Sequence, residues 1–402
     1  MKIRIKNTKT AEQETSAQIV ASIDELLEDI LLRLPVRSLI RFKIVSKHWL
    51  SLISNPQFAI LHKDRNPKIL HPALGLFLPC SRSRINTKFQ YINFDVHNPI
   101  SPPFSTLKFA KIQSAESIKI LQSCNGLLLC SSFRAQRPRL NYHVFNPTTK
   151  QLTTIPKPYR VIIHGMSLAF DPAAKSRAYK VVCVRSSGLV SSSYQIEIYS
   201  SDTAGPWRVS GQPFTAKHDF KNGICWNGAV HWLSHWGRDK SLYFNLDEER
   251  LGEVPPTPNN AELEAFMTYF GESCGHLHLI QMYGCPNIEF TVFEMMRDCS
   301  GWFVKNVVDL SAVTSAFPGM IRTELSPYDD DSCVYSVLSI IRGEKEEDAF
   351  LVLHIPGKAI RYNLVSQTFE KLCDFEGADE EEGYLRFEGV GAYQYIESLC
   401  GV

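Results

Sequence analysis

The stretch SIDELLEDILLRLPVRSLIRFKIVSKHWLSLISNPQFAILH, residues 22–62, determines how the rest of the chain is organised. Its large apolar residues recur at the three- and four-residue spacing of amphipathic helices. Pro35 has no backbone N–H and biases the preceding residue toward an extended conformation, so one helix ends there and another begins at or just after it. A third helical stripe runs to Asn55-Pro56. The pattern predicts a compact module of three helices.

The first of these helices has an acidic start and one apolar face. Ser22 and Glu25 have the spacing of a capping box, in which Ser22 caps the helix and Glu25 reaches back to it. At about 100° per residue, Leu32 falls on the polar face, and we expect it to be exposed there. The apolar arc opposite contains Leu26, Leu27, Ile30, Leu31 and Leu34.

This module has more large apolar side chains than it can bury alone. Its size is near the lower limit for independent folding, and the first cysteine of the chain, Cys80, lies beyond it. Five or six apolar side chains at about 1.5–3 kcal/mol each can outweigh an association cost on the order of 4–15 kcal/mol. We expect a separate subunit to cover them. The alternative is a helical subdomain packed against the chain's own C-terminal region.

Three motifs of the module resemble the F-box of plant F-box proteins: Leu34-Pro35, Val45-Ser46-Lys47-His48-Trp49, and residues 52–58. The resemblance implies a substrate receptor of a Skp–cullin–F-box ubiquitin ligase, which docks on a Skp-type adaptor and, through it, on a cullin. Many family members open with Leu-Pro where this chain has Ser22-Ile23, so one adaptor contact is absent. The expected adaptor-binding residues are Ile23, Leu26, Leu27, Ile30, Leu31, Leu34, Pro35, Val36, Leu39, Val45, Trp49 and Leu52.

Composition and charge are those of an ordinary globular protein. The chain has 402 residues, of which 44% are hydrophobic and 21% charged, and its net charge is +1. A charge so near zero argues against bulk attraction to nucleic acid or to a membrane. The N-terminus MKIRIKNTKT lacks the apolar core of a secretory signal, and no apolar run approaches the roughly 18 residues that span a bilayer.

The chain has eleven cysteines, an odd number, and no C-x-x-C pair. Such cysteines are typical of reduced thiols in a reducing compartment. We therefore expect the cytoplasm, the nucleus or both, without a disulfide framework, a zinc site or another cofactor. Residues 1–21 carry Lys2, Arg4, Lys6 and Lys9, and we interpret them as a solvated tail, with a nuclear-import signal as the alternative.

The periodicity changes after a connector at residues 63–68. From residue 69, short β-branched and aromatic runs alternate with Gly, Pro, Asn and Asp, which is typical of an all-β domain. An aromatic residue that ends a strand before a polar turn recurs roughly every 50 residues, the length of a β-propeller blade. These six anchors are Phe94, Phe145, Tyr199, Phe244, Phe293 and Tyr362.

The anchors predict six blades over residues 69–399, with a seven-bladed ring or a sandwich of two sheets as alternatives. The whole chain is then an α+β multidomain protein. We expect the terminal stretch, residues 384–396, to complete a blade beside residues 73–94, because closure leaves no long exposed sheet edge. This region resembles the F-box-associated domain of plant F-box proteins, whose kelch-like repeats are degenerate.

Candidate chemical sites in the β region have simpler structural interpretations. His231 and His235 are four residues apart, but their flanks are strand-like, whereas a zincin pair needs one face of a helix. His276 and His278 share a strand face without a local third ligand, and Cys124 precedes a turn glycine, so we interpret all three as structural. We expect no catalytic residue in this chain, because catalysis in such a ligase belongs to other subunits.

The substrate-binding face is marked only weakly. Trp236 belongs to the densest aromatic group, and we expect it and the nearby Arg238 on the open side of the ring, where propellers commonly bind partners. Arg134, Arg137 and Arg139, and the acidic runs at residues 344–348 and 379–382, are interpreted as solvated loops. The predicted function is recognition of a protein for ubiquitination. The alternatives are a decoy or regulatory protein acting without degradation, a small-molecule sensor, and a propeller enzyme.

Overall fold

The computed structural model describes residues 23–66, 72–80, 88–99, 101–107, 117–134, 137–158, 162–172, 174, 178–188, 192–234, 240–257, 265–283, 288–322, 334–343, 345–375 and 391–402. The chain forms two compact units, Met1–Ile69 and Leu70–Val402. Within the described residues, no helix combines the length and the apolar character needed to cross a bilayer.

The first unit is helical over its described residues. Its helices are α2 (Asp24–Leu31), α3 (Val36–Phe42), α4 (Lys47–Ser54) and α5 (Pro56–Arg65). The last of these is additional to the three predicted helices. Asn55 accepts a hydrogen bond at Oδ1 from the backbone N–H of Gln57 at 2.9 Å, and Pro56 takes the first helical position, where its missing N–H costs nothing. Asn55-Pro56 therefore starts a helix as well as ending one.

The start of α2 corrects two expectations. Its N-cap residue is Ile23, without a side-chain cap, so the predicted capping by Ser22 is wrong by one position, and Ser22 itself lies outside the described residues. Asp24 instead contacts His48 of α4, with 3.0 Å between Oδ1 and Nε2. Leu32 was expected to be exposed, yet it is buried. Leu32 keeps a helical backbone and donates its N–H to the Glu28 carbonyl at 2.8 Å, so the helix rotation still holds there. The sequence interpretation lacked α5, whose C-terminal end lies at Leu32, where Asn66 Nδ2 donates to the Leu32 carbonyl.

Polar contacts fix α5 against the end of α2. The His62 Nε2 atom lies 2.8 Å from the Leu34 carbonyl oxygen, and Asn66 Nδ2 donates to the Leu32 carbonyl at 2.8 Å. Asp29 pairs with Arg33 of the turn after α2 and with Arg65 at the end of α5. The contacts from His62 and Asn66 satisfy carbonyls that the end of a helix leaves without an intrahelical partner.

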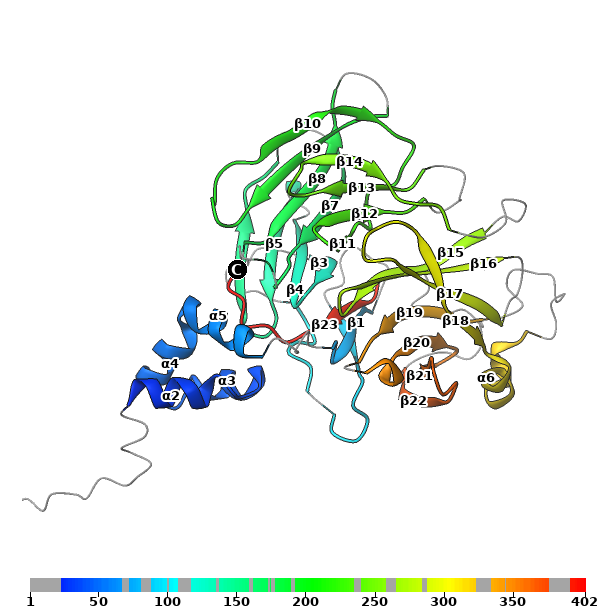
Figure 1. Cartoon of the computed structure of the whole chain (residues 1–402), viewed down its shortest axis with the longest axis horizontal. Helices are drawn as coiled ribbons and strands as arrows, with labels where there is room; N and C mark the ends of the chain where they lie inside the picture. Colours follow the sequence, from blue (N-terminus) through cyan, green and yellow to red (C-terminus); the bar gives the residue numbers. More distant parts are fainter. Residues whose placement is uncertain are drawn as a thin grey trace, which may run out of the picture. The chain divides into compact units, whose positions relative to one another are not determined.

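The second unit contains six antiparallel sheets arranged around a common centre (Figure 1), which confirms the six-bladed β-propeller. Blade 1 contains β2 (Phe89–Asn93), β1 (Gly75–Pro79) and β23 (Tyr393–Tyr395). Blade 2 contains β3 (Ser117–Cys124), β4 (Leu127–Arg134), β5 (Arg137–Asn146) and β6 (Gln151–Ile155). Blade 3 contains β7 (Ile163–Ala169), β8 (Lys180–Ser186), β9 (Ser193–Ser200) and β10 (Arg208–Thr215).

Blades 4 to 6 have the same meander of four strands. Blade 4 contains β11 (Ile224–Trp226), β12 (Ala229–Trp232), β13 (Leu242–Asn245) and β14 (Arg250–Glu253). Blade 5 contains β15 (Ala265–Ser273), β16 (His276–Tyr283), β17 (Glu289–Met295) and β18 (Trp302–Asp309), followed by α6 (Ser311–Ala316) and the 3₁₀ turn η2 (Pro318–Met320). Blade 6 contains β19 (Ser336–Ile341), η3 (Glu346–Asp348), β20 (Phe350–Ile355), β21 (Lys358–Asn363) and β22 (Phe369–Asp374).

The six aromatic anchors occupy equivalent places in the ring. In blades 2 to 6, the first strand of each blade contacts the first strand of the next blade, and β23 of blade 1 contacts β3. These innermost strands are β23, β3, β7, β11, β15 and β19. Counted outward from them, five anchors lie in the third strand of their blades and Phe94 directly follows the third strand of blade 1. All six side chains are buried. The repeat in the sequence therefore marks one packing position in each blade.

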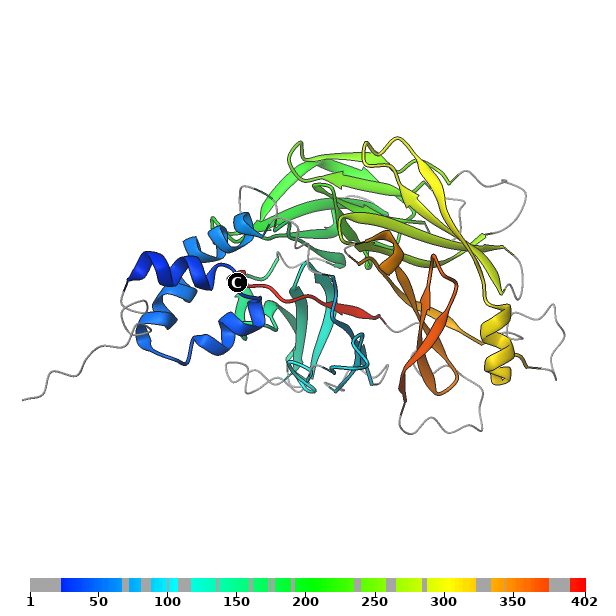
Figure 2. The same ribbon diagram turned by 60° about the horizontal axis from the view of Figure 1, so that its bottom comes forward.

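The chain's last strand closes the ring. In blade 1, β23 pairs with β1 in the register Gly75↔Tyr395 and Phe77↔Tyr393, and the Tyr393 hydroxyl donates to the Ile120 carbonyl at 2.7 Å. Figure 2 shows β23 and the segment after it in red, running along the strands of blade 2 to the C-terminus. The predicted closure is confirmed for β23, whereas residues 384–387 lie outside the described residues.

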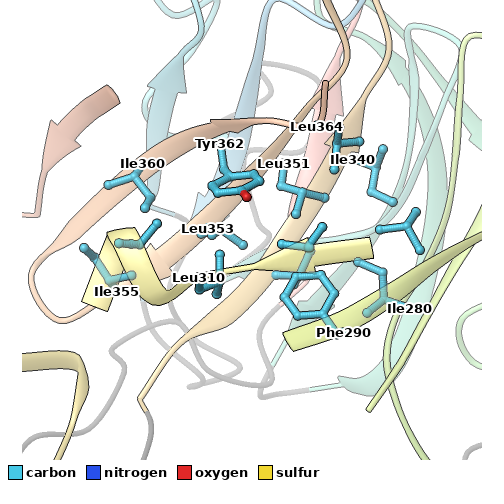
Figure 3. Packing of buried hydrophobic residues seen from close by; sticks show 14 of the residues in the cluster. Ile280, Phe290, Leu310, Ile340, Leu351, Leu353, Ile355, Ile360, Tyr362 and Leu364 are labelled. Atoms are coloured by element: carbon cyan, nitrogen blue, oxygen red, sulfur yellow. The ribbon is translucent and has the colours of Figure 1, made fainter. Parts of the chain in front are cut away.

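Apolar side chains fill the space between neighbouring blades. Figure 3 shows Leu351, Leu353 and Tyr362 of blade 6 facing Ile280 and Phe290 of blade 5, and all five are buried. The Tyr362 hydroxyl donates to the carbonyl of Asp309 in blade 5 at 3.0 Å, so the anchor side chain links two blades through its polar end as well. Each such buried side chain contributes about 1.5–3 kcal/mol, which makes blade contacts the main source of stability.

Candidate functional site

The helical unit exposes a row of apolar side chains. Leu26 and Ile30 are 48% and 47% exposed, and their spacing of four residues places them on one face of α2. Ile23, the N-cap residue directly before this helix, is 41% exposed. Val45, in the link between α3 and α4, is 57% exposed, and Pro35 is also exposed. Scattered apolar residues on a surface need no explanation, but a row along one helix face is typical of a docking surface.

The remaining residues of the predicted adaptor-binding set divide into two groups. Those that are partly exposed are Leu34, Trp49 and Leu52, whereas those that are buried are Leu27, Leu31, Val36 and Leu39. The buried four hold the unit together and are not available as surface. Trp49 is fixed in place, because its ring packs edge-on against Phe42 with 5.4 Å between centroids and its backbone N–H donates to Ser46 Oγ at 3.1 Å.

Two exposed apolar residues were missed by the sequence interpretation. Ile44 is 89% exposed and Leu50 is 45% exposed. Ile44 lies in the link between α3 and α4, where helical periodicity gives no indication of direction. The adjacent pair Ile44-Val45 between two predicted helices was the available signal, since a short polar connection has no structural need for two β-branched residues.

The histidine pair of blade 5 belongs to a buried ionic cluster. His276 Nδ1 lies 2.6 Å from Glu294 Oε1, and Arg342 donates to Glu294 Oε2 at 2.7 Å. Burial alone would raise the pKa of Glu294, but the bond from His276 and the charges of His276 and Arg342 outweigh it and lower the pKa to about 2. The carboxylate is ionised and already paired. Within the described residues, no group of three His, Cys, Asp or Glu side chains is arranged to hold a metal ion.

The sequence interpretation missed Glu294 because its place depends on strand pairing. Glu294 lies opposite His278 in the pairing of β16 with β17, far from it along the chain. His276 and His278 both lie against Glu294 of the next strand, and Arg342 of the next blade pairs with the same carboxylate. A search for ligand spacing along one strand cannot find such partners.

Comparison with known protein families follows the same division into two units. The family model described as "F-box domain" matches residues 24–61, and the one described as "F-box associated beta propeller domain" matches residues 80–294. The F-box protein At5g07610 of Arabidopsis thaliana is 37% identical over 414 residues, which cover 96% of this chain and 94% of the relative. The chain is a plant F-box protein.

Other Arabidopsis F-box proteins are more distant. The F-box protein At3g28330 is 23% identical over 280 residues, covering 66% of this chain and 68% of the relative. The F-box protein At5g10340 is 26% identical over 290 residues, covering 61% of this chain and 60% of the relative. Members of this family are generally adaptor or receptor subunits, and the present F-box protein matches an F-box model and an F-box-associated propeller model.

Cys124 of this F-box protein is a core thiol. Its side chain is buried and donates to the Phe170 carbonyl at 3.4 Å. A hydrogen bond with Cys225, together with burial, raises its pKa well above the ordinary value. A thiol held in its protonated form is a poor nucleophile, which agrees with the structural interpretation from the sequence.

The predicted substrate-face residues are not placed by the structure. Trp236 and Arg238 lie outside the described residues, as do His235, the side chains of Arg134, Arg137 and Arg139, and the acidic run at 379–382. Their role remains a prediction. Of the other acidic run, Glu346 is exposed and pairs with Lys305 of β18, so this run contributes an inter-blade contact as well as a solvated loop.

His231 supports a prediction about acid stability. It is buried in β12, its ring stacks on Tyr243, and Nδ1 has no hydrogen-bond partner among the described residues. Burial, only partly offset by the carbonyls of Ile224 and Ala229, lowers its pKa from 6.5 to about 4. The unfolded chain therefore binds more protons between these values, and stability present above pH 6.5 is lost as the pH falls toward 4.

We expect His231→Phe to reduce this loss. Between pH 7 and pH 5, one such histidine costs about 2 kcal/mol of unfolding free energy, so the variant should lose about 2 kcal/mol less than the natural protein. Urea unfolding followed by tryptophan fluorescence at both pH values measures the difference. His97→Phe, at an exposed position, is the matched control and should follow the natural protein. Equal losses for all three proteins would contradict the prediction.

Proposed function

We propose that this F-box protein is the substrate-recognition subunit of a Skp–cullin–F-box ubiquitin ligase. Its helical unit binds a Skp-type adaptor and, through it, a cullin. Its propeller binds a target protein and holds it where a lysine can be ubiquitinated, so the chain contributes proximity rather than chemistry. The observation that carries the proposal is the exposed pair Leu26 and Ile30 on a helix that the F-box family model covers from residue 24, with the exposed Ile23 directly before it.

The energetics of the exposed row suit a stable complex. Each large apolar side chain that leaves water completely contributes about 1.5–3 kcal/mol, and the residues in question still have about half of their surface to bury. With Pro35, Ile44, Val45 and Leu50 added, the gain matches an association cost on the order of 4–15 kcal/mol. Ile23 occupies the position at which many family members have a proline, and its side chain offers an apolar contact in place of that proline.

Location follows from the same proposal. A receptor that delivers proteins for ubiquitination works in the cytoplasm or the nucleus. The nine described cysteines are free thiols, which suits a reducing compartment.

The proposal is tested by capture of partners from plant cells with and without a proteasome inhibitor. We expect a Skp-type adaptor in both samples and at least one further protein that accumulates when the proteasome is blocked and when this chain is absent. A captured protein whose abundance never changes would favour a decoy or regulatory role. Absence of the adaptor from both samples would overturn the proposal.

A further inference from the structure

The chain's own C-terminal segment lies on blade 2 in a defined seat. Asn146 Nδ2 donates to the carbonyl oxygens of Ser398 and Cys400 at 3.0 and 2.7 Å, and Thr148 Oγ1 accepts from the Ser398 N–H at 3.2 Å. A Cβ atom at Gly126 would lie 2.7 Å from Ser398 Cβ and 2.9 Å from the Ile396 carbonyl oxygen. Blade 2 thus holds the N–H and the C=O of one residue, and a glycine allows the close approach.

The parts of this seat recur in blades 4 and 6. We call them the cradle: the residue directly before the second strand, the asparagine that follows the aromatic anchor, and the residue two positions after that asparagine. The cradle of blade 2 is Gly126, Asn146 and Thr148. The corresponding residues are Gly228, Asn245 and Asp247 in blade 4, and Ala349, Asn363 and Val365 in blade 6.

Hydrogen bonds establish this equivalence. Leu246 donates its N–H to the Gly228 carbonyl and Leu364 donates its N–H to the Ala349 carbonyl, each at 2.9 Å. In blade 2 the residue at this position is Pro147, which has no N–H. Each asparagine accepts at Oδ1 from the backbone N–H groups two and three residues later, at 2.8 to 3.2 Å. The shared turn fixes the side-chain rotamer, so Nδ2 points the same way in all three blades.

Two of the three cradles are occupied by the chain itself. The C-terminal segment occupies that of blade 2, and in blade 6 Asn363 Nδ2 donates to the Glu347 carbonyl of the loop before β20 at 2.8 Å. In blade 4, Asn245 Nδ2 has no acceptor among the described residues, and no described atom lies within 4 Å of a Cβ built at Gly228. Gly126 is buried, whereas Gly228 is exposed.

We propose that the blade 4 cradle binds an extended segment of a partner protein, clamping the N–H and the C=O of one of its residues as blade 2 clamps Ser398. Asn245 Nδ2 donates to the carbonyl, and Asp247 accepts the N–H with a carboxylate where blade 2 has the Thr148 hydroxyl. The Asp247 side chain is 90% exposed, and its one ion-pair partner in the part of the chain that the structure describes is Lys180 at 3.8 Å, so it is accessible. A carboxylate is a stronger acceptor than a hydroxyl.

The cradle also limits which segments can bind. Because Asn245 and Asp247 bond only to backbone groups, the segment must be extended, and the N–H and C=O of the clamped residue must be unpaired in the free partner. The open surface at Gly228 suits a small side chain at the clamped position, such as the serine that the chain itself uses at blade 2. This inference rests on the proposed function, and it names where on the propeller a target protein docks.

A peptide with the chain's own terminal sequence is the probe. We would synthesise residues 395–402, with Cys400→Ser and a photoreactive diazirine at position 399, and cross-link it to the full chain. Mass spectrometry should map cross-links to residues 227–228 and 245–248 of blade 4. Cross-links found solely around Gly126 and Asn146, where the peptide would displace the natural tail, would overturn the proposal.

Two variants test the residues. Asn245→Asp keeps oxygen atoms for the turn but loses the donor, and we expect about tenfold less blade 4 cross-linking. Gly228→Asn fills the cradle with a residue that tolerates the positive φ of 72° at this position, and should block the peptide while the turn is preserved. Asn363→Asp makes the same chemical change in blade 6 and should leave the yield intact. An unchanged yield in both blade 4 variants would contradict the proposal.

The outcome is separable from that of the proposed function. The peptide experiment involves neither the adaptor nor ubiquitination, so loss of adaptor capture would overturn the ligase assignment without affecting the cradle. Conversely, a target captured equally by the natural chain, Asn245→Asp and Asn363→Asp would overturn the cradle as its docking site and leave the ligase assignment intact. A target lost only with Asn245→Asp would support both.

Discussion

The double change Leu26→Glu and Ile30→Glu is expected to abolish capture of a Skp-type adaptor by this F-box protein. Both side chains are about half exposed on one face of α2, so the change leaves the buried Leu27 and Leu31 untouched. Each loses roughly 1 kcal/mol of apolar burial, and each buries a charge at the interface at a similar or greater cost, for a total of about 3–5 kcal/mol. That loss weakens binding by at least about a hundredfold, measurable by surface plasmon resonance.

A control must separate the effect of two added negative charges from the effect of placing them on α2. Val209→Glu with Val307→Glu adds the same charge at two exposed apolar positions of the propeller, and this matched variant should bind the adaptor normally. Circular dichroism should give equal helix content for both variants, because none of the four positions is buried. Retained adaptor binding by the α2 variant, with its fold intact, would show that this row is not the docking surface.

The fold was predictable where a signal repeats locally. The anchors from Phe94 to Tyr362 recur because each blade buries an aromatic side chain in, or directly after, its third strand. The same packing requirement therefore produces an aromatic residue at six regularly spaced places in the sequence. The turns repeat for a similar reason: Asn125-Gly126 and Asn227-Gly228 have positive φ at both residues, as a tight hairpin requires. The six anchors therefore favoured six blades and closure by the end of the chain over a seven-bladed ring or a sandwich, and the structure confirms the six-bladed ring.

Contacts between distant strands were not predictable in this way. Glu294 meets the two histidines because β17 pairs with β16, and Arg342 reaches it from the next blade, neither of which has a spacing signature. Leu32 was assigned to the wrong environment because α5, which the sequence interpretation did not predict, lies against the end of α2. The open cradle of blade 4 could not be predicted either, because Asn146 and Asn245 occur in similar sequence contexts. The two asparagines differ in what their Nδ2 atoms contact, which only the structure shows.

Removal of residues 393–402 should unfold the propeller while the helical unit keeps its helices. The deletion takes away β23, the innermost strand of blade 1, and the buried side chains of Tyr393 and Tyr395. Loss of two buried aromatic side chains costs about 3–5 kcal/mol each, which is comparable to the whole stability of roughly 5–15 kcal/mol that a domain has. Limited proteolysis should then degrade the β unit and spare a helical fragment.

Two further experiments test whether loss of ring closure causes the unfolding of the truncated chain. Tyr393→Phe removes only the hydrogen bond to the Ile120 carbonyl and should cost about 1 kcal/mol, so the ring stays closed and the protease-resistant core persists. A synthetic peptide of residues 391–402 added to the truncated chain should restore that resistance, because β23 is held by pairing with β1 and by contacts to blade 2 rather than by its covalent link. A truncated chain that resists protease without the peptide would mean that five complete blades and an incomplete first blade are stable alone, and that the terminal strand serves another purpose.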